Sequence, residues 1–421
     1  QTPLRHVPNL EKVLFHYCQD GEYNDFWSQE ICNQEPHFHK AADVPAVYSG
    51  GWYDPFAVAT THQFATMAAR SKAPQKLIMG PWTHNGMRTG ATSAGDVDFG
   101  PHASFGTAVY NQQRLRWFDR WLKDIHNGAE HDPPVQIFVM GGGDGKRNAQ
   151  GRLNHGGAWR QEVSWPLSHA EAHSYYLRAD SRLTLEAPVE DEVPLRYTHD
   201  PTWPVPTIAS NVTALSRLEK LAEGSDWIPP RDRMTPLVIN GGGHQKEAPE
   251  HMGARPPFPL LADRPDVLVF QTDLLQASVE ITGTITVVLV MSSTAVDTDF
   301  TAKLLDVYPP SEDYPAGYHL NLSDSIIRAR YRHGFDRARM LTPGKISCVS
   351  LLLPPTSNLF KSGHRIRLDI ASSNFPKYDV NPGTGEPLGR HTHTIACSNT
   401  LYMGPRWRSR IELPVVKPKP G

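Results

Sequence analysis

The stretch VPAVYSGGWYDPF, residues 44–56, decides how this 421-residue chain is expected to fold. Residues 44–48 form a short apolar run, and a glycine pair at 50–51 ends it. A short apolar run closed by glycine is typical of a strand buried in a parallel sheet. Asp54 follows directly, where the carboxyl end of such a strand opens into a loop and functional groups collect.

The residues around this stretch continue with alternating helix and strand patterns. The alanine-rich segment 56–70 predicts a helix, KLIMG at 76–80 a second buried strand, and residues 107–127 a long helix. VQIFVMG at 135–141 adds a further strand. The polar and aromatic residues 1–43 predict only short helices and loops. The order strand, helix, strand, helix indicates a parallel α/β sheet.

The long helix carries one apolar stripe, whose members recur at steps of three and four residues: Leu115, Phe118, Trp121, Leu122 and Ile125. A stripe of this kind is typical of a helix that packs on a core. Gly128 follows as the expected C-terminal cap.

Beyond about residue 160 the pattern changes to β-branched or alternating runs separated by Pro, Gly, Asn and Asp. Many short strands with turn residues between them favour a β-sandwich. We therefore expect two domains, residues 1–165 and residues 166–421, joined near WPLSH at 165–169.

Asp54 and His84 form the candidate catalytic pair. His84 lies in GPWTHNG, directly after the second predicted strand, so both side chains follow successive parallel strands. An acid followed along the chain by a histidine fits the last two members of an α/β-hydrolase triad, whose order is Ser, Asp, His. The alternatives are structural, since Asp54 could simply cap the following helix and His84 could be a hydrogen-bonded loop residue.

Several blocks resemble one family in the family's order. These are GGWYDPF, KLIMGPWTHNG, GDVDFG (95–100), LRWFDRWLK (115–123), DTDFTAKLLDVYP (297–309) and the long segment 341–385. They are similar to the CocE/NonD, or cocaine-esterase-like, serine hydrolases, which are related to the X-Pro dipeptidyl-peptidases. The resemblance implies the C-terminal half of an α/β-hydrolase domain, with residues 1–43 ending its lid, followed by a jelly-roll, galactose-binding-like β-sandwich.

The resemblance also assigns roles to residues. The family's acid and histidine fall on Asp54 and His84, and Phe56 matches an aromatic residue that lines the acyl pocket in some members. Trp27, in YNDFW at 23–27, is a weaker candidate for substrate binding. For both aromatic residues, packing in a core is the alternative.

The nucleophile is missing, because no G-x-S-x-G string occurs in the sequence. ATSAG at 91–95 offers Ser93, but it lacks the first glycine and follows the histidine. The chain starts at QTPLRH without a methionine, so we expect an N-terminal segment or a second chain to supply the serine.

The expected activity is hydrolysis of a small ester, an amide or a short peptide. An X-Pro dipeptidyl-peptidase-like enzyme and a non-catalytic binding fragment are the alternatives.

Composition excludes other classes of function. The chain has 42 basic and 44 acidic residues, a balance with no electrostatic footprint for nucleic acid or an anionic membrane. No run of about 18 apolar residues predicts a membrane span. The mechanism requires no cofactor or metal, and the histidines of HTH (391–393) and GGGH (241–244) have no third ligand placed by spacing. The four cysteines match no zinc pattern, and their disulfide state stays open.

Overall fold

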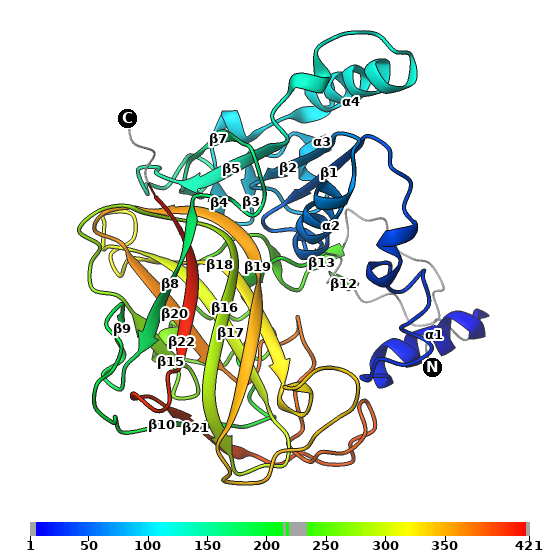
Figure 1. Cartoon of the computed structure of the whole chain (residues 1–421). Helices are drawn as coiled ribbons and strands as arrows, with labels where there is room; N and C mark the ends of the chain where they lie inside the picture. The colour runs from blue at the N-terminus through cyan, green and yellow to red at the C-terminus, as the bar shows by residue number, and fades with distance from the viewer. Residues whose placement is uncertain (1–5, 214–215, 219–233, 418–421) are drawn as a thin grey trace.

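The computed structural model describes residues 6–213, 216–218 and 234–417. A mixed sheet with helices lies above a larger strand-rich part (Figure 1). The N-terminal segment contains the helix α1 (Pro8–Gln19) and the short 3-10 helix η2 (Glu35–Lys40), with loops between them. Within the described part of the chain, no helix is long and apolar enough to cross a membrane.

Three parallel strands form the part of the sheet that precedes the strand-rich region. They are β1 (Ala46–Gly51), β2 (Gln75–Gly80) and β5 (Val135–Gly141), in the order β1-β2-β5. Helix α2 (Ala57–Arg70) connects β1 to β2 and packs against both strands. The parallel arrangement expected for residues 44–141 is therefore present, with boundaries within about two residues of those expected for these elements.

Helix α4 (Gly106–Leu122) differs from expectation in its end and in its packing. It stops five residues before the expected end at 127, because Asp124 adopts a left-handed conformation with φ 55°. Gly128 instead precedes the 3-10 helix η4 (Ala129–His131). The apolar stripe does not pack on a core: Leu115, Phe118, Leu122 and Ile125 are exposed.

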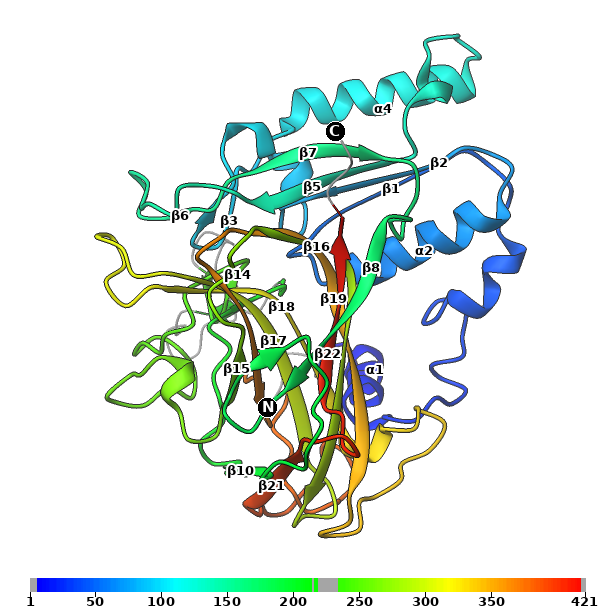
Figure 2. The ribbon, with the colours of Figure 1, turned by 60° about the vertical axis from the view of Figure 1, so that its left-hand side comes forward.

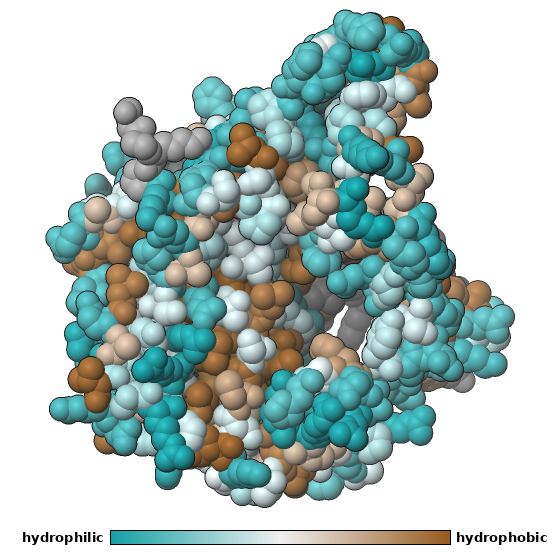
Figure 3. Space-filling model, in the orientation of Figure 1, coloured by the Kyte–Doolittle hydropathy of each residue, from teal (hydrophilic) through white to brown (hydrophobic). Residues whose placement is uncertain are grey.

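The reason is that α4 stands off from the sheet. It lies on an arm above β1, β2, β5 and β7 (Figure 2), and Trp117 is its only buried residue. Between the helix and the strands runs a groove of about 500 Å³, which we call the α4 groove; its lining includes Val47, Ile78, Tyr110 and Phe118. Apolar side chains are visible on the arm at the top right of the molecular surface (Figure 3).

The strand-rich part contains a four-stranded antiparallel sheet in the order β15-β20-β17-β18. Its strands are β15 (Leu268–Gln271), β20 (Arg365–Ala371), β17 (Asp299–Tyr308) and β18 (Tyr318–Arg328). Strand β17 buries nine of its ten residues, since one face meets the apolar core and the other meets polar segments packed over the sheet.

The second sheet of this part is built around β16. Its strands are β8 (Ala170–Leu177), β9 (Leu183–Thr184), β10 (Leu195–His199), β16 (Val279–Ser293), β19 (Ser347–Phe360), β21 (Cys397–Tyr402) and β22 (Arg410–Val416). Strand β16 alternates buried and partly exposed residues, as expected for a strand with one face on the core. These pairings are antiparallel, so the predicted change from parallel to antiparallel pairing is present.

The two regions share a sheet and a core. Strand β19 forms a parallel pair with β5, and β7 (Gly157–Glu162) forms an antiparallel pair with β5. One apolar cluster contains Trp52 and Leu77 together with Ile281 and Leu304. The division near residue 165 stays a prediction about domains, because the hydrogen-bonded sheet continues across it.

The remaining elements are short. They are the helices α3 (Gly86–Thr89), η3 (Pro101–Ala103), η6 (Leu261–Asp263) and η7 (Ala329–Tyr331), and the strands β3 (Ser93–Ala94), β4 (Val97–Asp98), β6 (Leu153–Asn154), β11 (Ala209–Ser210), β12 (Ser216–Leu218), β13 (Met234–Pro236) and β14 (Ile239–Asn240). The four cysteines are unbonded, so Cys348 and Cys397 form no disulfide in the structure.

Candidate active site

Asp54 and His84 lie side by side because the strands before them do. The parallel pairing of β1 with β2 places Gly51 opposite Gly80, so the loops that follow emerge at the same edge of the sheet. The backbone N–H of Trp52 donates to the carbonyl of Gly80 at 2.9 Å, and that of Tyr53 donates to the carbonyl of Trp82 at 3.1 Å. Backbone hydrogen bonds thus join the two loops at the residues that directly precede Asp54 and His84.

Glycine is required where the loops approach. A Cβ atom on Gly51 would lie 2.0 Å from the carbonyl oxygen of Trp82, a distance that no side chain allows. The N–H of Asp54 also donates back to the carbonyl of Gly51 at 3.1 Å, which closes a tight turn. The glycine that ends the strand therefore also sets the turn that presents the carboxylate.

The expected hydrogen bond joins the two side chains. Nδ1 of His84 lies 3.0 Å from Oδ2 of Asp54, and the other carboxylate oxygen accepts the N–H of Phe56 at 2.9 Å. Asp54 is buried, whereas the His84 side chain is 42 % exposed. A carboxylate only accepts, so this contact places a proton on Nδ1, and in the neutral imidazole Nε2 then carries the free lone pair.

Nε2 of His84 has no hydrogen-bond partner among the described residues. Ser93 lies in β3, where it pairs with Asp98, and no hydrogen bond connects it to His84. The pair can therefore take up a proton from a group that approaches from outside, provided that this group comes within hydrogen-bond reach of Nε2.

The two aromatic candidates lie in different places. The ring of Phe56 is 54 % exposed and stands edge-on to His84, with ring centroids 5.3 Å apart. Trp27 is half-buried; its indole N–H donates to the carbonyl of Asp20 at 2.6 Å, and its ring contacts Tyr17 and Phe26. The structure thus brings Phe56 to the pair, whereas the described contacts of Trp27 stay within its own segment.

Sequence reasoning missed the aromatic anchors of the two loops. The indole N–H of Trp52 donates to the carbonyl of Phe138 in β5 at 2.7 Å, and that of Trp82 donates to the carbonyl of Ala103 at 2.9 Å. Both indoles are almost fully buried. The available signal was the tryptophan in each motif, GGWYD and GPWTH, because a buried indole usually needs a hydrogen-bond acceptor.

The histidine of GGGH, which invited a metal interpretation, has other partners. His244 stacks on Tyr318 with ring centroids 4.7 Å apart, and its Nδ1 accepts the N–H of His319 at 3.0 Å. Burial lowers the pKa of His244 to about 4. No group of three or more His, Cys, Asp or Glu residues in the described ranges could hold a metal ion.

Comparisons with known proteins identify the family of the chain. The model of the X-Pro dipeptidyl-peptidase (S15 family) matches residues 1–86, a range that contains Asp54 and His84. The model of the X-Pro dipeptidyl-peptidase C-terminal non-catalytic domain matches residues 127–412. The chain therefore belongs to the CocE/NonD, cocaine-esterase-like family, which is related to the X-Pro dipeptidyl-peptidases.

Individual relatives cover nearly the whole chain. Cocaine esterase of Rhodococcus sp. (strain MB1 Bresler) is 32 % identical over an alignment of 430 positions, gaps included, that covers 99 % of this chain and 64 % of the esterase. An α-amino acid ester hydrolase structure has 25 % identity and a TM-score of 0.75, over 97 % of this chain and 62 % of that one. An aminopeptidase from a marine sediment Thaumarchaeota archaeon shares the fold, with 24 % identity, a TM-score of 0.75 and coverage of 99 % and 61 %. The chain thus spans about three fifths of the length of these relatives.

Proposed function

We propose that Asp54 and His84 are the acid and the base of a serine hydrolase that cleaves carboxylic esters or amides. The observation that carries the proposal is the 3.0 Å contact between a buried carboxylate and Nδ1 of a histidine whose side chain is 42 % exposed. In fold terms, residues 1–165 are the C-terminal part of an α/β-hydrolase domain, and residues 166–421 are a jelly-roll β-sandwich.

The chemistry follows from the geometry. Nε2 of His84 removes the proton from a serine hydroxyl as its oxygen attacks the carbonyl carbon, and it then gives that proton to the departing alcohol or amine. The acyl-serine formed is hydrolysed by a water molecule that His84 activates in the same way. Asp54 holds the tautomer of His84 and stabilises the imidazolium. No step requires a metal or an organic cofactor.

The nucleophile comes from a polypeptide outside these 421 residues. No G-x-S-x-G segment occurs in the chain, whereas the free edge of β1 offers a place for one. Strand β1 is the outermost of the described strands of its sheet, and both Val47 within it and Val44 just before it are exposed. An outermost strand presents a row of unpaired backbone N–H and C=O groups, to which a further strand can pair. A strand added parallel to β1 would end beside Asp54 and His84, where a serine on a strand-to-helix turn is needed.

A small ester is the favoured substrate. The cocaine esterase and ester hydrolase similarities support an ester, and Phe56 offers an apolar wall beside His84 for the acyl group. The S15 match over residues 1–86 favours an X-Pro dipeptidyl-peptidase-like activity as the second candidate. Trp27 stays a weaker prediction for substrate binding. Neither a nucleic acid nor a membrane is part of the proposal.

A serine-directed fluorophosphonate probe tests the assignment. The 421-residue chain alone should not be labelled, and it should hydrolyse p-nitrophenyl acetate hardly faster than free imidazole does. Combined with a polypeptide that carries the G-x-S-x-G region of a family member, it should give labelling on that polypeptide and turnover. Stoichiometric labelling of the isolated chain at Ser93 or another of its serines would contradict the location of the nucleophile. A complex that forms but neither labels nor turns over would favour a non-catalytic binding role.

A further inference from the structure

Tyr53, the residue directly before Asp54, connects the acid loop to the strand-rich part. Its side chain is buried, and its hydroxyl donates to the backbone carbonyl of Asn321 at 2.9 Å. Asn321 lies in β18, on the antiparallel sheet that contributes no residue to the candidate pair. Burial raises the pKa of the Tyr53 phenol, so the hydroxyl stays protonated and remains a donor at any physiological pH.

The direction of the Asp54 carboxylate depends on the backbone that precedes it. Its oxygens bond only to His84 and to the N–H of Phe56 among the described residues, so no neighbouring cation fixes the side chain. Hydrogen bonds hold the backbone before Asp54 instead. The Trp52 indole donates to β5, and Tyr53 donates through both its backbone N–H and its hydroxyl. Of these anchors, the Tyr53 hydroxyl is the one that reaches the strand-rich part.

The acceptor side of this contact is itself held by several hydrogen bonds. The Asn321 side chain donates to the carbonyl of Ala209 at 2.9 Å and accepts the N–H of Gly243 at 2.8 Å. Gln245 contacts the same amide oxygen at 3.3 Å and also accepts a hydrogen bond from the buried ammonium of Lys303. A buried network whose members bond to one another resists displacement. The carbonyl of Asn321, which accepts the Tyr53 hydrogen bond, is therefore held in place.

The triple glycine at 241–243, which matches no metal site, packs against the same hydroxyl. A Cβ atom on Gly242 would lie 2.9 Å from the Tyr53 hydroxyl oxygen and 2.8 Å from side-chain atoms of Leu320 and Val97. Gly242 also forms a β-bridge with Gly95, in the loop region that follows His84. Because it lacks a Cβ atom, Gly242 can lie close to three segments at the same time: strand β18, the loop that carries Tyr53 and Asp54, and the residues around Gly95.

We propose that Tyr53 is a positioning residue for Asp54, held by the carbonyl of Asn321 and by the glycine segment 241–243. The inference rests on the proposed role of the Asp54–His84 pair. It gives the strand-rich part a role in the geometry of the reaction, although no described side chain of that part forms a hydrogen bond with Asp54 or His84.

The test uses the intact chain and the downfield proton resonance of the His84 Nδ1–H, which requires the hydrogen bond to Asp54. Tyr53→Phe keeps the ring and removes only the donor, so the resonance should broaden and its proton should exchange faster with solvent. Tyr48→Phe is the matched control, because Tyr48 lies in β1, just before the acid loop, and its hydroxyl donates a hydrogen bond of the same 2.9 Å length to Gln75. That variant should keep the wild-type resonance.

The outcomes separate this inference from the proposed function. A resonance that Asp54→Asn abolishes but Tyr53→Phe leaves unchanged overturns the positioning role and leaves the catalytic pair intact. A wild-type chain with no such resonance contradicts the pair itself, and with it the inference. If Tyr53→Phe does not fold, Gly242→Ala, which crowds the hydroxyl from the other side, replaces it and should change the resonance in the same way.

Kinetics give a second reading in the complex with the nucleophile-bearing polypeptide. Tyr53→Phe should lower kcat by about tenfold and leave KM unchanged, because misplacement of a catalytic group affects the transition state rather than substrate binding. Equal changes in kcat for Tyr53→Phe and Tyr48→Phe would show a general loss of structure and overturn the specific role.

Discussion

At the scale of single residues, Asp54 and His84 should differ in how much activity their loss removes. In the complex with the nucleophile-bearing polypeptide, His84→Ala should abolish ester hydrolysis, because no other described group can reach the serine proton. Asp54→Asn should lower kcat by about 10⁴-fold, since an amide favours the wrong tautomer of the imidazole. Steady-state kinetics with p-nitrophenyl acetate measure both.

A second histidine, next to helix α4, provides a control for the loss of a histidine that pairs with a carboxylate. His126 is exposed beside α4 and faces Glu130, so it also pairs with a carboxylate. His126→Ala should keep wild-type kinetics. If Asp54→Asn behaves like His126→Ala, the carboxylate only caps helix α2.

The sequence predicted the positions of Asp54 and His84 because a parallel sheet brings the carboxyl ends of neighbouring strands together. It could not predict Tyr53 as an anchor. The acceptor is the backbone carbonyl of Asn321, and a carbonyl is present at every residue, so no side-chain pattern marks it. The glycines at 241–243 were visible, but their purpose depends on what packs against them.

At the scale of elements, the apolar stripe of α4 should contribute little to stability in the isolated chain. Leu122 is 77 % exposed, so Leu122→Ser should change the free energy of unfolding by less than about 0.5 kcal/mol. Trp117 is buried, and Trp117→Ala should cost about 3 kcal/mol. Urea denaturation followed by circular dichroism compares the two. A loss above about 1 kcal/mol for Leu122→Ser would mean that the stripe is covered in solution.

The sequence predicted whether most elements are helices or strands, but it did not predict which elements they pack against or pair with. Periodicity reports which face of an element is apolar, but for α4 it does not report whether anything covers that face. The same limit applies to β5 and β19. Their parallel contact at Met140 and Asn358 joins the two regions into one sheet, and nothing local to either strand specifies it.

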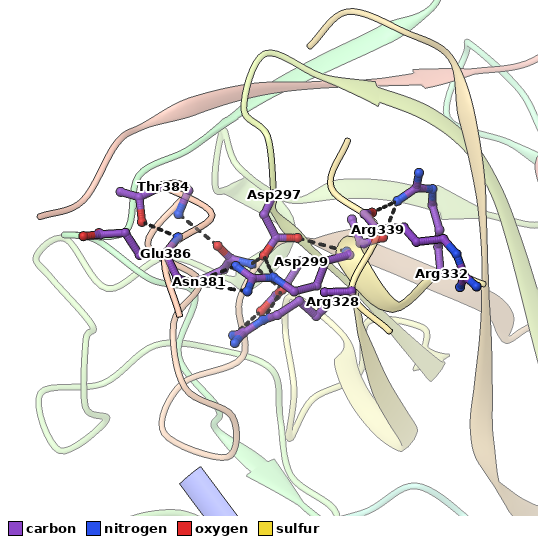
Figure 4. A network of polar contacts seen from close by, with 12 residues as sticks. Asp297, Asp299, Arg328, Arg332, Arg339, Asn381, Thr384 and Glu386 are labelled. Atoms are coloured by element: carbon purple, nitrogen blue, oxygen red, sulfur yellow. Dashed lines mark hydrogen bonds and ion pairs between the residues drawn. The ribbon is translucent and has the colours of Figure 1, made fainter. Parts of the chain in front are cut away.

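At the scale of the whole molecule, buried titratable groups give stability a pH dependence with opposing contributions. Asp299, in β17, bonds to Arg328 and Asn381 in a buried network (Figure 4). Burial raises its pKa from 3.8 to about 6. A group with a raised pKa in the folded state stabilises below its unfolded value, and this stabilisation is lost as the pH rises through about 6.

Two histidines act in the other direction. Burial is the main cause that lowers the pKa of His244 to about 4 and that of His319 to about 3. Their stabilisation is complete above the unfolded value near 6.5 and is lost as the pH falls. Burial also lowers the pKa of three further histidines, which are His155, His199 and His251. The chain should therefore lose stability below about pH 6, and Asp299 should moderate that loss.

Asp299→Asn should therefore make the acid destabilisation steeper. Between pH 7 and pH 4 the variant should lose on the order of 2 kcal/mol more than the wild type, because the proton uptake by Asp299 no longer favours the folded state. Urea denaturation at several pH values measures the difference in slope. Asp379→Asn is the control, because Asp379 faces the same guanidinium of Arg328 at 3.2 Å but is 80 % exposed. That variant should follow the wild-type curve, and a parallel curve for Asp299→Asn as well would show that Asp299 is ionised at every pH tested.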